Sequence, residues 1–200
     1  MLIRDEIAAD SEAIRKVHEL AFNSPAEAEL VDLLRARGKA TISLVAEEDE
    51  EILGHVLFSP VQIDPPSLGW KALGLAPVGV IPERQRQGIG KALIWQGLER
   101  CRSIGVRAIV VLGDPDYYTQ FGFERAKDFG LGNEYQVEDE FMVMELIPGS
   151  LEGVEGIVRY AQEFSEVDVR SPDIAAYSFA GPGFCRPTLA TLCSRCNVLE

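Results

Sequence analysis

The chain is poor in histidine and cysteine: among its 200 residues are two histidines and four cysteines. Three of the cysteines, Cys185, Cys193 and Cys196, lie close together near the C-terminus, and no histidine follows His55. A structural zinc site needs four ligands, so this local set is one short. The sequence therefore predicts no metal site, and it predicts free thiols in a reducing compartment.

Long hydrophobic runs are also missing. No stretch approaches the roughly 20 apolar residues that a membrane helix needs, so we expect no contact with a membrane. The first six residues, 1–6, form a short strand pattern and lack the basic start and apolar core of a signal peptide. We expect a cytoplasmic protein.

Basic residues are outnumbered, with 19 lysines and arginines against 32 acidic residues and a net charge of -13. A nucleic-acid partner requires a basic surface, so this balance argues against one. Hydrophobic residues make up 46% of the chain and charged residues 26%, as in a globular protein. The length is that of one ordinary domain with a short appendage.

The most informative segment joins an apolar strand, 71–81, to an amphipathic helix, 88–102, through a polar loop with spaced glycines. This order leaves backbone N–H groups free at a helix N-terminus. Free N–H groups and the positive end of the helix dipole together favour a phosphate ligand.

Three kinds of glycine loop compete for this segment. A P-loop needs Gly and Ser/Thr around its Lys, but Gln85 and Ala92 stand at those positions around Lys91. A dinucleotide fingerprint needs a third Gly, where Leu93 stands, and an acidic residue on the next strand, which reaches Gly113 without one. The third kind is the coenzyme A loop, Gln/Arg-x-x-Gly-x-Gly/Ala, and it is matched in full by Gln85-Arg86-Gln87-Gly88-Ile89-Gly90.

Local charge supports that match. The cations Arg84, Arg86 and Lys91 make the loop a positive island on an acidic chain. Local fields, rather than net charge, govern the docking of a small anionic ligand.

Hydrophobic periodicity predicts an α/β protein. The expected helices cover 10–22, 24–37, 88–102 and a short turn at 114–120. The expected strands cover 2–6, 41–46, 52–63, 71–81, 107–112, 141–146 and 156–164, with one more starting at Phe123. Alternation in strand 52–63 predicts Leu53, His55 and Leu57 on one face and Ile52 on the other. We expect a domain over 1–165 and an irregular or disordered tail over 166–200.

Two motifs resemble the GNAT superfamily of acyl-CoA N-acyltransferases. They are Val80-x-Pro82-x-x-Gln85-x-x-Gly88-Ile89-Gly90 and Tyr118-x-x-x-Gly122-Phe123. The segment 54–60, Gly-His-Val-Leu-Phe-Ser-Pro, is similar to a bacterial subgroup of predicted N-acetyltransferases. The resemblance spans about residues 1–165. It implies a mixed, mostly antiparallel sheet with helices on both faces and a central, splayed pair of parallel strands, which end at Val80 and Leu112.

The resemblance also implies an activity: transfer of an acetyl group from acetyl-CoA to a primary amine by direct attack. The main chain of Val78 and Val80 would bind the pantetheine arm, and Tyr118 would protonate the departing thiolate, with Tyr117 as the alternative. The cofactor's pyrophosphate would be held at Gln85, Arg86, Gln87, Gly88, Ile89, Gly90 and Lys91. Relatives often dimerise, so a homodimer is one possibility, and the oligomeric state stays open.

Two positions depart from the family pattern. Arg86 stands where many relatives have Gly; an arginine is acceptable there if its φ is negative, and it adds positive charge near the phosphate. Asp114 replaces the usual Asn before the short helix, so that contact to the coenzyme is an open question.

No general base is evident. Glu29 and Glu83 are candidates that no spacing selects. His55 is either a base or a hydrogen-bonded structural residue, and His18 is expected at the surface or at the edge of the core. A second function therefore stays open: a module of the same fold that binds or senses acyl-CoA without turnover.

Overall fold

The structure is a computed structural model, and it describes residues 1–67 and 69–167. Its strands are β1 (Leu2–Asp5), β2 (Ile42–Glu48), β3 (Glu51–Pro60), β4 (Gln62–Asp64), β5 (Ala72–Val80), β6 (Ala108–Leu112), β7 (Glu124–Arg125), β8 (Leu131–Asn133), β9 (Phe141–Glu145) and β10 (Gly156–Arg159). Its α-helices are α1 (Ser11–Phe22), α2 (Ala26–Ala36), α3 (Ile89–Ser103), α4 (Pro115–Tyr118) and α5 (Glu163–Glu166).

The main sheet of the described residues has seven strands in the order β1-β2-β3-β5-β6-β9-β7. Neighbouring strands are antiparallel except β5 and β6, which are parallel and central. This arrangement confirms the predicted mixed, mostly antiparallel fold with a parallel pair at its centre. A small second sheet, in the order β4-β10-β8, was not predicted.

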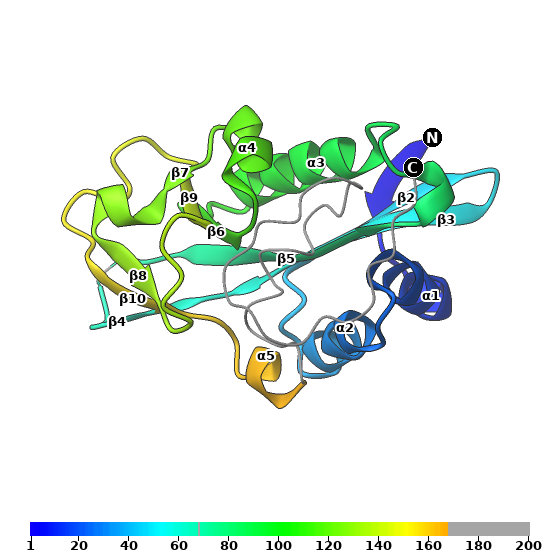
Figure 1. Cartoon of the computed structure of the whole chain (residues 1–200), viewed down its shortest axis with the longest axis horizontal. Coiled ribbons are helices and arrows are strands. Elements are labelled where there is room, and N and C mark those ends of the chain that lie inside the picture. The colour runs from blue at the N-terminus through cyan, green and yellow to red at the C-terminus, as the bar shows by residue number, and fades with distance from the viewer. Residues whose placement is uncertain (68, 168–200) are drawn as a thin grey trace, which may run out of the picture.

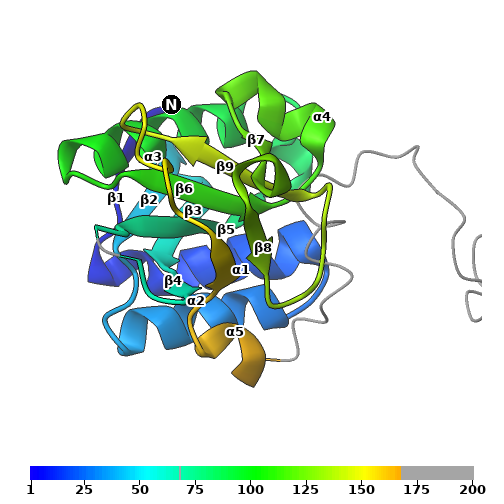
Figure 2. The ribbon, with the colours of Figure 1, turned by 90° about the vertical axis from the view of Figure 1, so that its left-hand side faces the viewer.

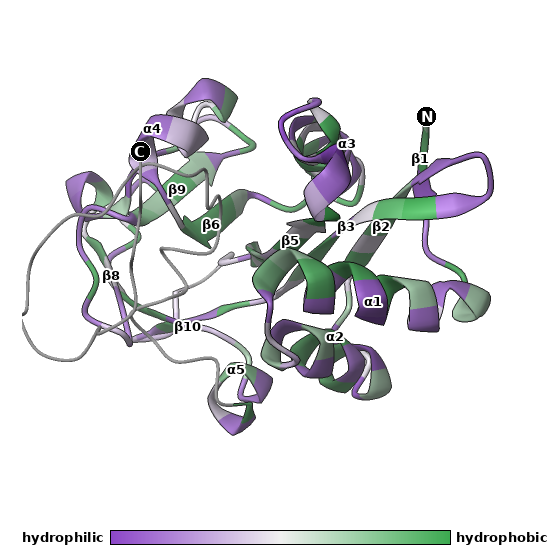
Figure 3. Ribbon diagram, turned by 45° about the vertical axis from the view of Figure 1, so that its right-hand side comes forward, coloured by the Kyte–Doolittle hydropathy of each residue, from purple (hydrophilic) through white to green (hydrophobic). Residues whose placement is uncertain are grey.

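Helices cover both faces of the main sheet, as predicted. Figures 1 and 2 show α3 and α4 on one face and α1 and α2 on the other. Each face has its own apolar cluster, and β3, β5 and β6 contribute side chains to both. In Figure 3 the central strands are accordingly hydrophobic, whereas the helices are hydrophobic on one side only.

The parallel pair stays together for only three residues. Ala72–Gly74 of β5 pair with 108–110 of β6, and the two strands then separate. From there β5 continues along β3 as far as Val80, whereas β6 stays with β9 to the pair Leu112–Phe141. In the same region β5 carries a β-bulge, because Leu75 to Val78 span only two steps of β3.

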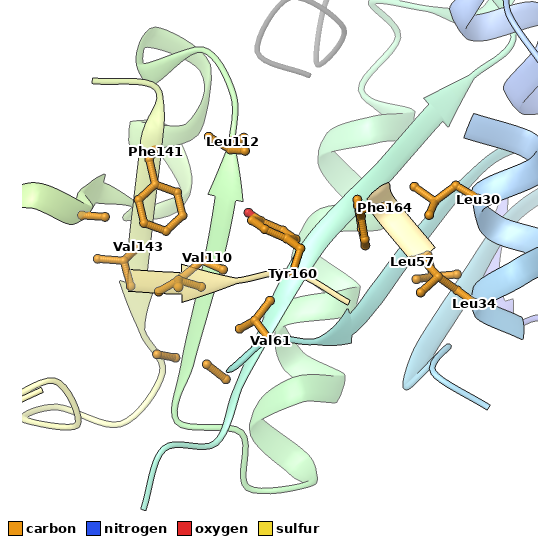
Figure 4. Close-up of a cluster of buried hydrophobic side chains, with 14 of the residues drawn as sticks. Leu30, Leu34, Leu57, Val61, Val110, Leu112, Phe141, Val143, Tyr160 and Phe164 are labelled. Carbon is orange, nitrogen blue, oxygen red and sulfur yellow. The ribbon is translucent and has the colours of Figure 1, made fainter. Parts of the chain in front are cut away.

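Tyr160 fills the point where β5 and β6 part. Its side chain is buried, and an added Cβ on Gly74, the last paired residue of β5, would lie only 2.7 Å from the Tyr160 ring. Figure 4 shows the ring in the cluster that also contains Leu112 of β6 and Phe164 of α5. The segment after β9 therefore closes the inner end of the gap between the two strands.

Three details of the predicted strands are wrong. The strand predicted over 52–63 is interrupted at Val61 and forms β3 and β4, and the strand predicted over 156–164 ends at Arg159. A bulge at Leu53, opposite the step from Ala46 to Glu47, reverses the expected faces. Ile52 therefore packs in the cluster of Leu57, and Leu53 packs in the other.

The domain boundary predicted at 165/166 falls inside α5, and the predicted tail lies outside the described residues from 168 onward. Cys185, Cys193 and Cys196 lie there too. Among the helices that the structure does describe, none is both long and apolar enough to cross a bilayer.

We expect the substitution Gly97→Ala to destabilise the fold. Gly97 lies on the inner face of α3, where an added Cβ would come within 2.3 Å of the ring of Phe58, a wholly buried residue of β3. Overpacking of this kind costs about 1–3 kcal/mol, measured by thermal or urea denaturation. Gln96→Ala, at the exposed neighbouring position, is the control and should stay within about 0.5 kcal/mol of wild type. Equal stability of all three proteins would contradict this packing.

Candidate active site

A cavity of about 500 Å³ lies along the edge of β5 that β6 has left open. It is bounded by the end of α1, by the second half of β5, by the loop that follows, and by the start of α3. Its lining residues are Ala21, Phe22, Val78, Gly79, Val80, Pro82, Arg84, Gln85, Arg86, Gly88, Ile89, Gly90, Lys91 and Tyr117.

The end of β5 presents main-chain polar groups to this cavity. Ile81 N–H donates to Leu53 O of β3 at 3.0 Å. Main-chain groups alternate sides along a strand, so those of Val80 and Val78 point away from β3, toward the side where β6 has diverged. The carbonyl of Val80 accepts a hydrogen bond from Gln85 Nε2 at 3.1 Å, which ties the loop back to the strand.

The loop turns through two left-handed residues, Arg86 with φ 59° and Gly88 with φ 85°. The condition of a negative φ at Arg86 is therefore not met. A left-handed conformation costs a side-chain-bearing residue about 1–2 kcal/mol, whereas Gly88 adopts it freely. The chain therefore passes from this turn directly into the first residue of α3.

The first turn of α3 has free donors. Its first intrahelical bond runs from Ala92 N–H to Gly88 O at 2.9 Å, so the N–H groups of Ile89, Gly90 and Lys91 have no partner earlier in the helix. These residues line the cavity, and the positive end of the helix dipole adds to their effect.

The positive island around the loop is smaller than its composition suggests. Arg84 pairs with Glu48 of β2, which offsets its charge. Among the ion pairs of the described residues, none involves Arg86 or Lys91. These two cations are available to an anion in the cavity.

The residues predicted to bind the cofactor converge on this cavity with one exception. Gln87 does not line it: its amide nitrogen donates to Glu83 O at 3.1 Å, and its amide oxygen accepts from Arg84 at 3.2 Å. The residues that do converge are Val78, Val80, Gln85, Arg86, Gly88, Ile89, Gly90 and Lys91.

The two adjacent tyrosines occupy different positions. Tyr117 lines the cavity, whereas Tyr118 is 0% exposed and does not. The Tyr118 ring packs edge-on against Tyr117, at 5.2 Å between centroids, and against Phe123, at 5.6 Å. Burial raises the pKa of Tyr117, and neighbouring Tyr118 raises it further, so Tyr117 keeps its proton at neutral pH.

His18 is not at the surface or the core edge, and that expectation is wrong. The residue is 0% exposed and stacks on Phe22, with 5.7 Å between ring centroids. A signal for its burial was present in the sequence: His18 shares a helical face with Ile14 and Val17, the spacing of a buried side of α1.

The two histidines belong to a buried polar chain. His18 Nε2 lies 2.8 Å from His55 Nδ1, and His55 Nε2 lies 2.7 Å from the hydroxyl of Ser43. That hydroxyl donates to the carboxylate of Glu6, which also accepts from Arg35 Nε at 2.5 Å. Side chains from α1, β3, β2, α2 and the segment after β1 therefore meet in one hydrogen-bonded line.

Burial and neighbouring polar groups have opposing effects on pKa values in this line of hydrogen-bonded side chains. Burial acts to raise the pKa of Glu6, but hydrogen bonds from His55, Arg35 and Ser43 outweigh it and hold the pKa well below its usual range. Burial lowers the pKa of His55, and it lowers that of His18 further because His55 and Arg35 add to the effect. Both imidazoles are therefore neutral at pH 7, beside an ionised carboxylate.

Other expected acids and ligands do not join the site. Glu29 and Glu83 are exposed, and neither lines the cavity. Asp114 caps α4, its carboxylate accepting from Asp116 N–H at 2.9 Å. Within 1–67 and 69–167, no group of three or more His, Cys, Asp or Glu side chains is placed to hold a metal ion.

Comparison with known proteins bears on the family. Residues 3–126 match the family described as Acetyltransferase (GNAT) domain. The uncharacterized N-acetyltransferase YhbS of Escherichia coli K12 is 40% identical over 167 residues, which cover 82% of this chain and 99% of YhbS. A second relative, the uncharacterized N-acetyltransferase YjhQ of the same strain, is 36% identical over 139 residues, 66% of this chain and 75% of YjhQ.

Solved structures agree. The crystal structure of E. coli YhbS in complex with CoA has a TM-score of 0.78 and 37% identity, covering 82% of this chain and 91% of that one. A GNAT acetyltransferase from Brucella melitensis, in complex with acetyl-CoA, has a TM-score of 0.69 and 39% identity, covering 82% and 97%. The open β5 edge, the glycine loop and these likenesses lead to one conclusion: the chain belongs to the GNAT family of acetyltransferases.

Proposed function

We propose that this protein moves an acetyl group from acetyl-CoA to a primary amine by direct attack. The observation that carries the proposal is the cavity itself, which joins an unpaired strand edge to a helix N-terminus with free N–H donors. The structures of the CoA and acetyl-CoA complexes, at 37% and 39% identity, support acetyl-CoA as the donor.

In this proposal the cofactor takes the place of the missing strand. Its pyrophosphate binds the N–H groups at the start of α3 and the cations Arg86 and Lys91. Its pantetheine arm runs along β5 and bonds the main chain of Val78 and Val80. An N–H near Val78 polarises the thioester carbonyl as negative charge develops on its oxygen.

The amine nitrogen then attacks the carbonyl carbon, and the C–S bond breaks as the amide forms. No protein nucleophile is needed. The thiolate takes a proton from a tyrosine, for which we propose Tyr118 on its motif position. Tyr117 is the alternative, because its ring stands in the wall of the cavity.

Gly88→Ala should weaken binding of coenzyme A. Alanine is strained at φ 85°, so the turn that positions the phosphate-binding N–H groups would shift. We expect an affinity loss of at least about tenfold in titration calorimetry, equivalent to about 1.4 kcal/mol. Gly105→Ala is the matched control, because Gly105 ends the same helix with φ 72° and lies outside the cavity. That variant should bind as wild type, and unchanged binding by Gly88→Ala would refute the loop assignment.

Tyr118→Phe should lower turnover and leave coenzyme A affinity unchanged. Loss of a general acid costs about 100-fold in kcat, measured by thiol release from acetyl-CoA with pooled primary amines. Tyr117→Phe is the matched control and should keep wild-type turnover. The reverse pattern would assign the acid to Tyr117. Full activity in both variants would exclude a tyrosine acid, and coenzyme A binding without turnover by wild type would favour a sensing module.

A further inference from the structure

His18 directs an unpartnered nitrogen toward the wall of the cavity. Its Nδ1 is buried and has no hydrogen-bond partner among the described residues. An added Cβ on Gly79 would lie 3.0 Å from this nitrogen, and Gly79 lines the cavity. Phe22, which stacks on His18, lines it as well. One backbone residue, Gly79, therefore separates Nδ1 from the cavity.

The hydrogen-bond partners fix where each proton resides. The Glu6 carboxylate is ionised and only accepts, so the Ser43 hydroxyl gives its one proton to Glu6. The Ser43 oxygen must then accept from His55 Nε2. His55 Nδ1 is left as an acceptor for the Nε2–H of His18. By elimination His18 Nδ1 carries a lone pair and no proton.

A lone pair buried without a donor is costly, and such groups in native proteins call for an explanation. A histidine that only packed in the core would gain nothing from a nitrogen without a hydrogen-bond donor. A general base needs such a lone pair, because its nitrogen must be unprotonated when the reaction begins in order to accept a proton.

Building on the proposed acetyl transfer, we propose that His18 Nδ1 accepts the proton of the attacking amine and that His55, beside Glu6, holds the resulting positive charge. The amine nitrogen bonds the acetyl carbon, the C–S bond breaks, and the nitrogen's proton passes to His18 Nδ1 through one water. At the same time the Nε2 proton of His18 moves to His55 Nδ1. When the products leave, the histidine pair gives its extra proton to solvent by the reverse path and the tyrosinate takes one proton from solvent, so the enzyme is regenerated.

The surrounding charges favour the second histidine as the resting place of the cation. The groups that face His18 are His55 and Arg35, both of which disfavour a proton on it. His55 faces Arg35 too, but the carboxylates of Glu6 and Asp10 favour its protonation, and Glu6 Oε2 lies 3.5 Å from its Nε2. A charge relayed to His55 is thus compensated, whereas one left on His18 is not.

Nuclear magnetic resonance tests the proton positions without any amine. The chain has two histidines, so long-range ¹H–¹⁵N spectra of histidine-labelled protein show two rings, which the variant His18→Gln assigns. At pH 7.5 we expect both rings neutral and protonated on Nε2. A proton on His18 Nδ1 would overturn the proposal, whatever the activity of the protein.

Kinetics test the role in turnover. In His18→Gln the side-chain amide can still donate to His55, but the basic nitrogen that accepts the proton is lost. We expect kcat to fall about 100-fold, with KM for acetyl-CoA and affinity for coenzyme A unchanged. Ser43→Ala should cause a smaller loss of kcat, because it cuts the link to Glu6. Ser59→Ala, another serine of the core and outside the chain of hydrogen bonds, should match wild type.

The pH profile separates a base from a structural residue. Amine protonation alone gives log kcat/KM a slope of one on the acid side. Burial holds the pKa of His18 well below 6.5, so its protonation should raise the wild-type slope to two only at pH values well below 6.5, and His18→Gln should keep a slope of one. Circular dichroism at each pH checks folding.

Wild-type kinetics and equal slopes in His18→Gln would overturn the role of His18 while leaving acetyl transfer intact. Failure of wild type to acetylate any pooled amine would instead remove the proposed function, and the role of His18 with it.

Discussion

The active site depends on one constraint: β5 and β6 keep different outer neighbours. Each of the two strands pairs with its antiparallel partner to the end, β5 with β3 and β6 with β9, and these partners diverge. After Gly74 and Val110 the parallel pair therefore loses its hydrogen bonds. An edge of main-chain donors and acceptors left inside a protein must find other partners. A ligand with an extended, amide-bearing arm meets that need.

A single helix links the cavity to the buried hydrogen-bonded chain. The end of α1 reaches the cavity at Phe22, and His18 lies one turn earlier on the same face. Gly79 permits this approach, because a side chain there would collide with the His18 ring. The helix that shapes the site thus also carries the imidazole behind its wall. The contacts between α1 and β5 therefore affect both the shape of the cavity and the position of His18.

The sequence predicts those features that depend on residues close together in the chain. The glycine loop follows from a strand, a turn and a helix start in succession. Eight of the nine residues predicted to bind the cofactor, in this loop, in β5 and at the start of α3, line the cavity. Tyr117 and Tyr118 are adjacent, so the sequence alone does not show which one is buried; in the structure Tyr118 is the one that packs in the core, against Phe121 and Phe123. The His18–His55 contact joins residues 37 positions apart, and no local pattern encodes it.

The errors in the predicted strands also come from contacts between residues that are distant in sequence. The bulge at Leu53 arises from pairing with β2, not from the alternation within β3. The second sheet escaped prediction because β4 and β8 have three residues each, too few to show a period. Short strands gain their structure from neighbours, and those neighbours are distant in sequence.

Tyr160 closes the inner end of the gap between β5 and β6. It lies in a segment beyond residue 126, where the family match ends. The last paired residue of β5 is a glycine for this reason, because an added Cβ on Gly74 would lie 2.7 Å from the Tyr160 ring. A position within the family match and one beyond it are thus coupled by shape, and a larger side chain at position 74 requires a smaller one at position 160.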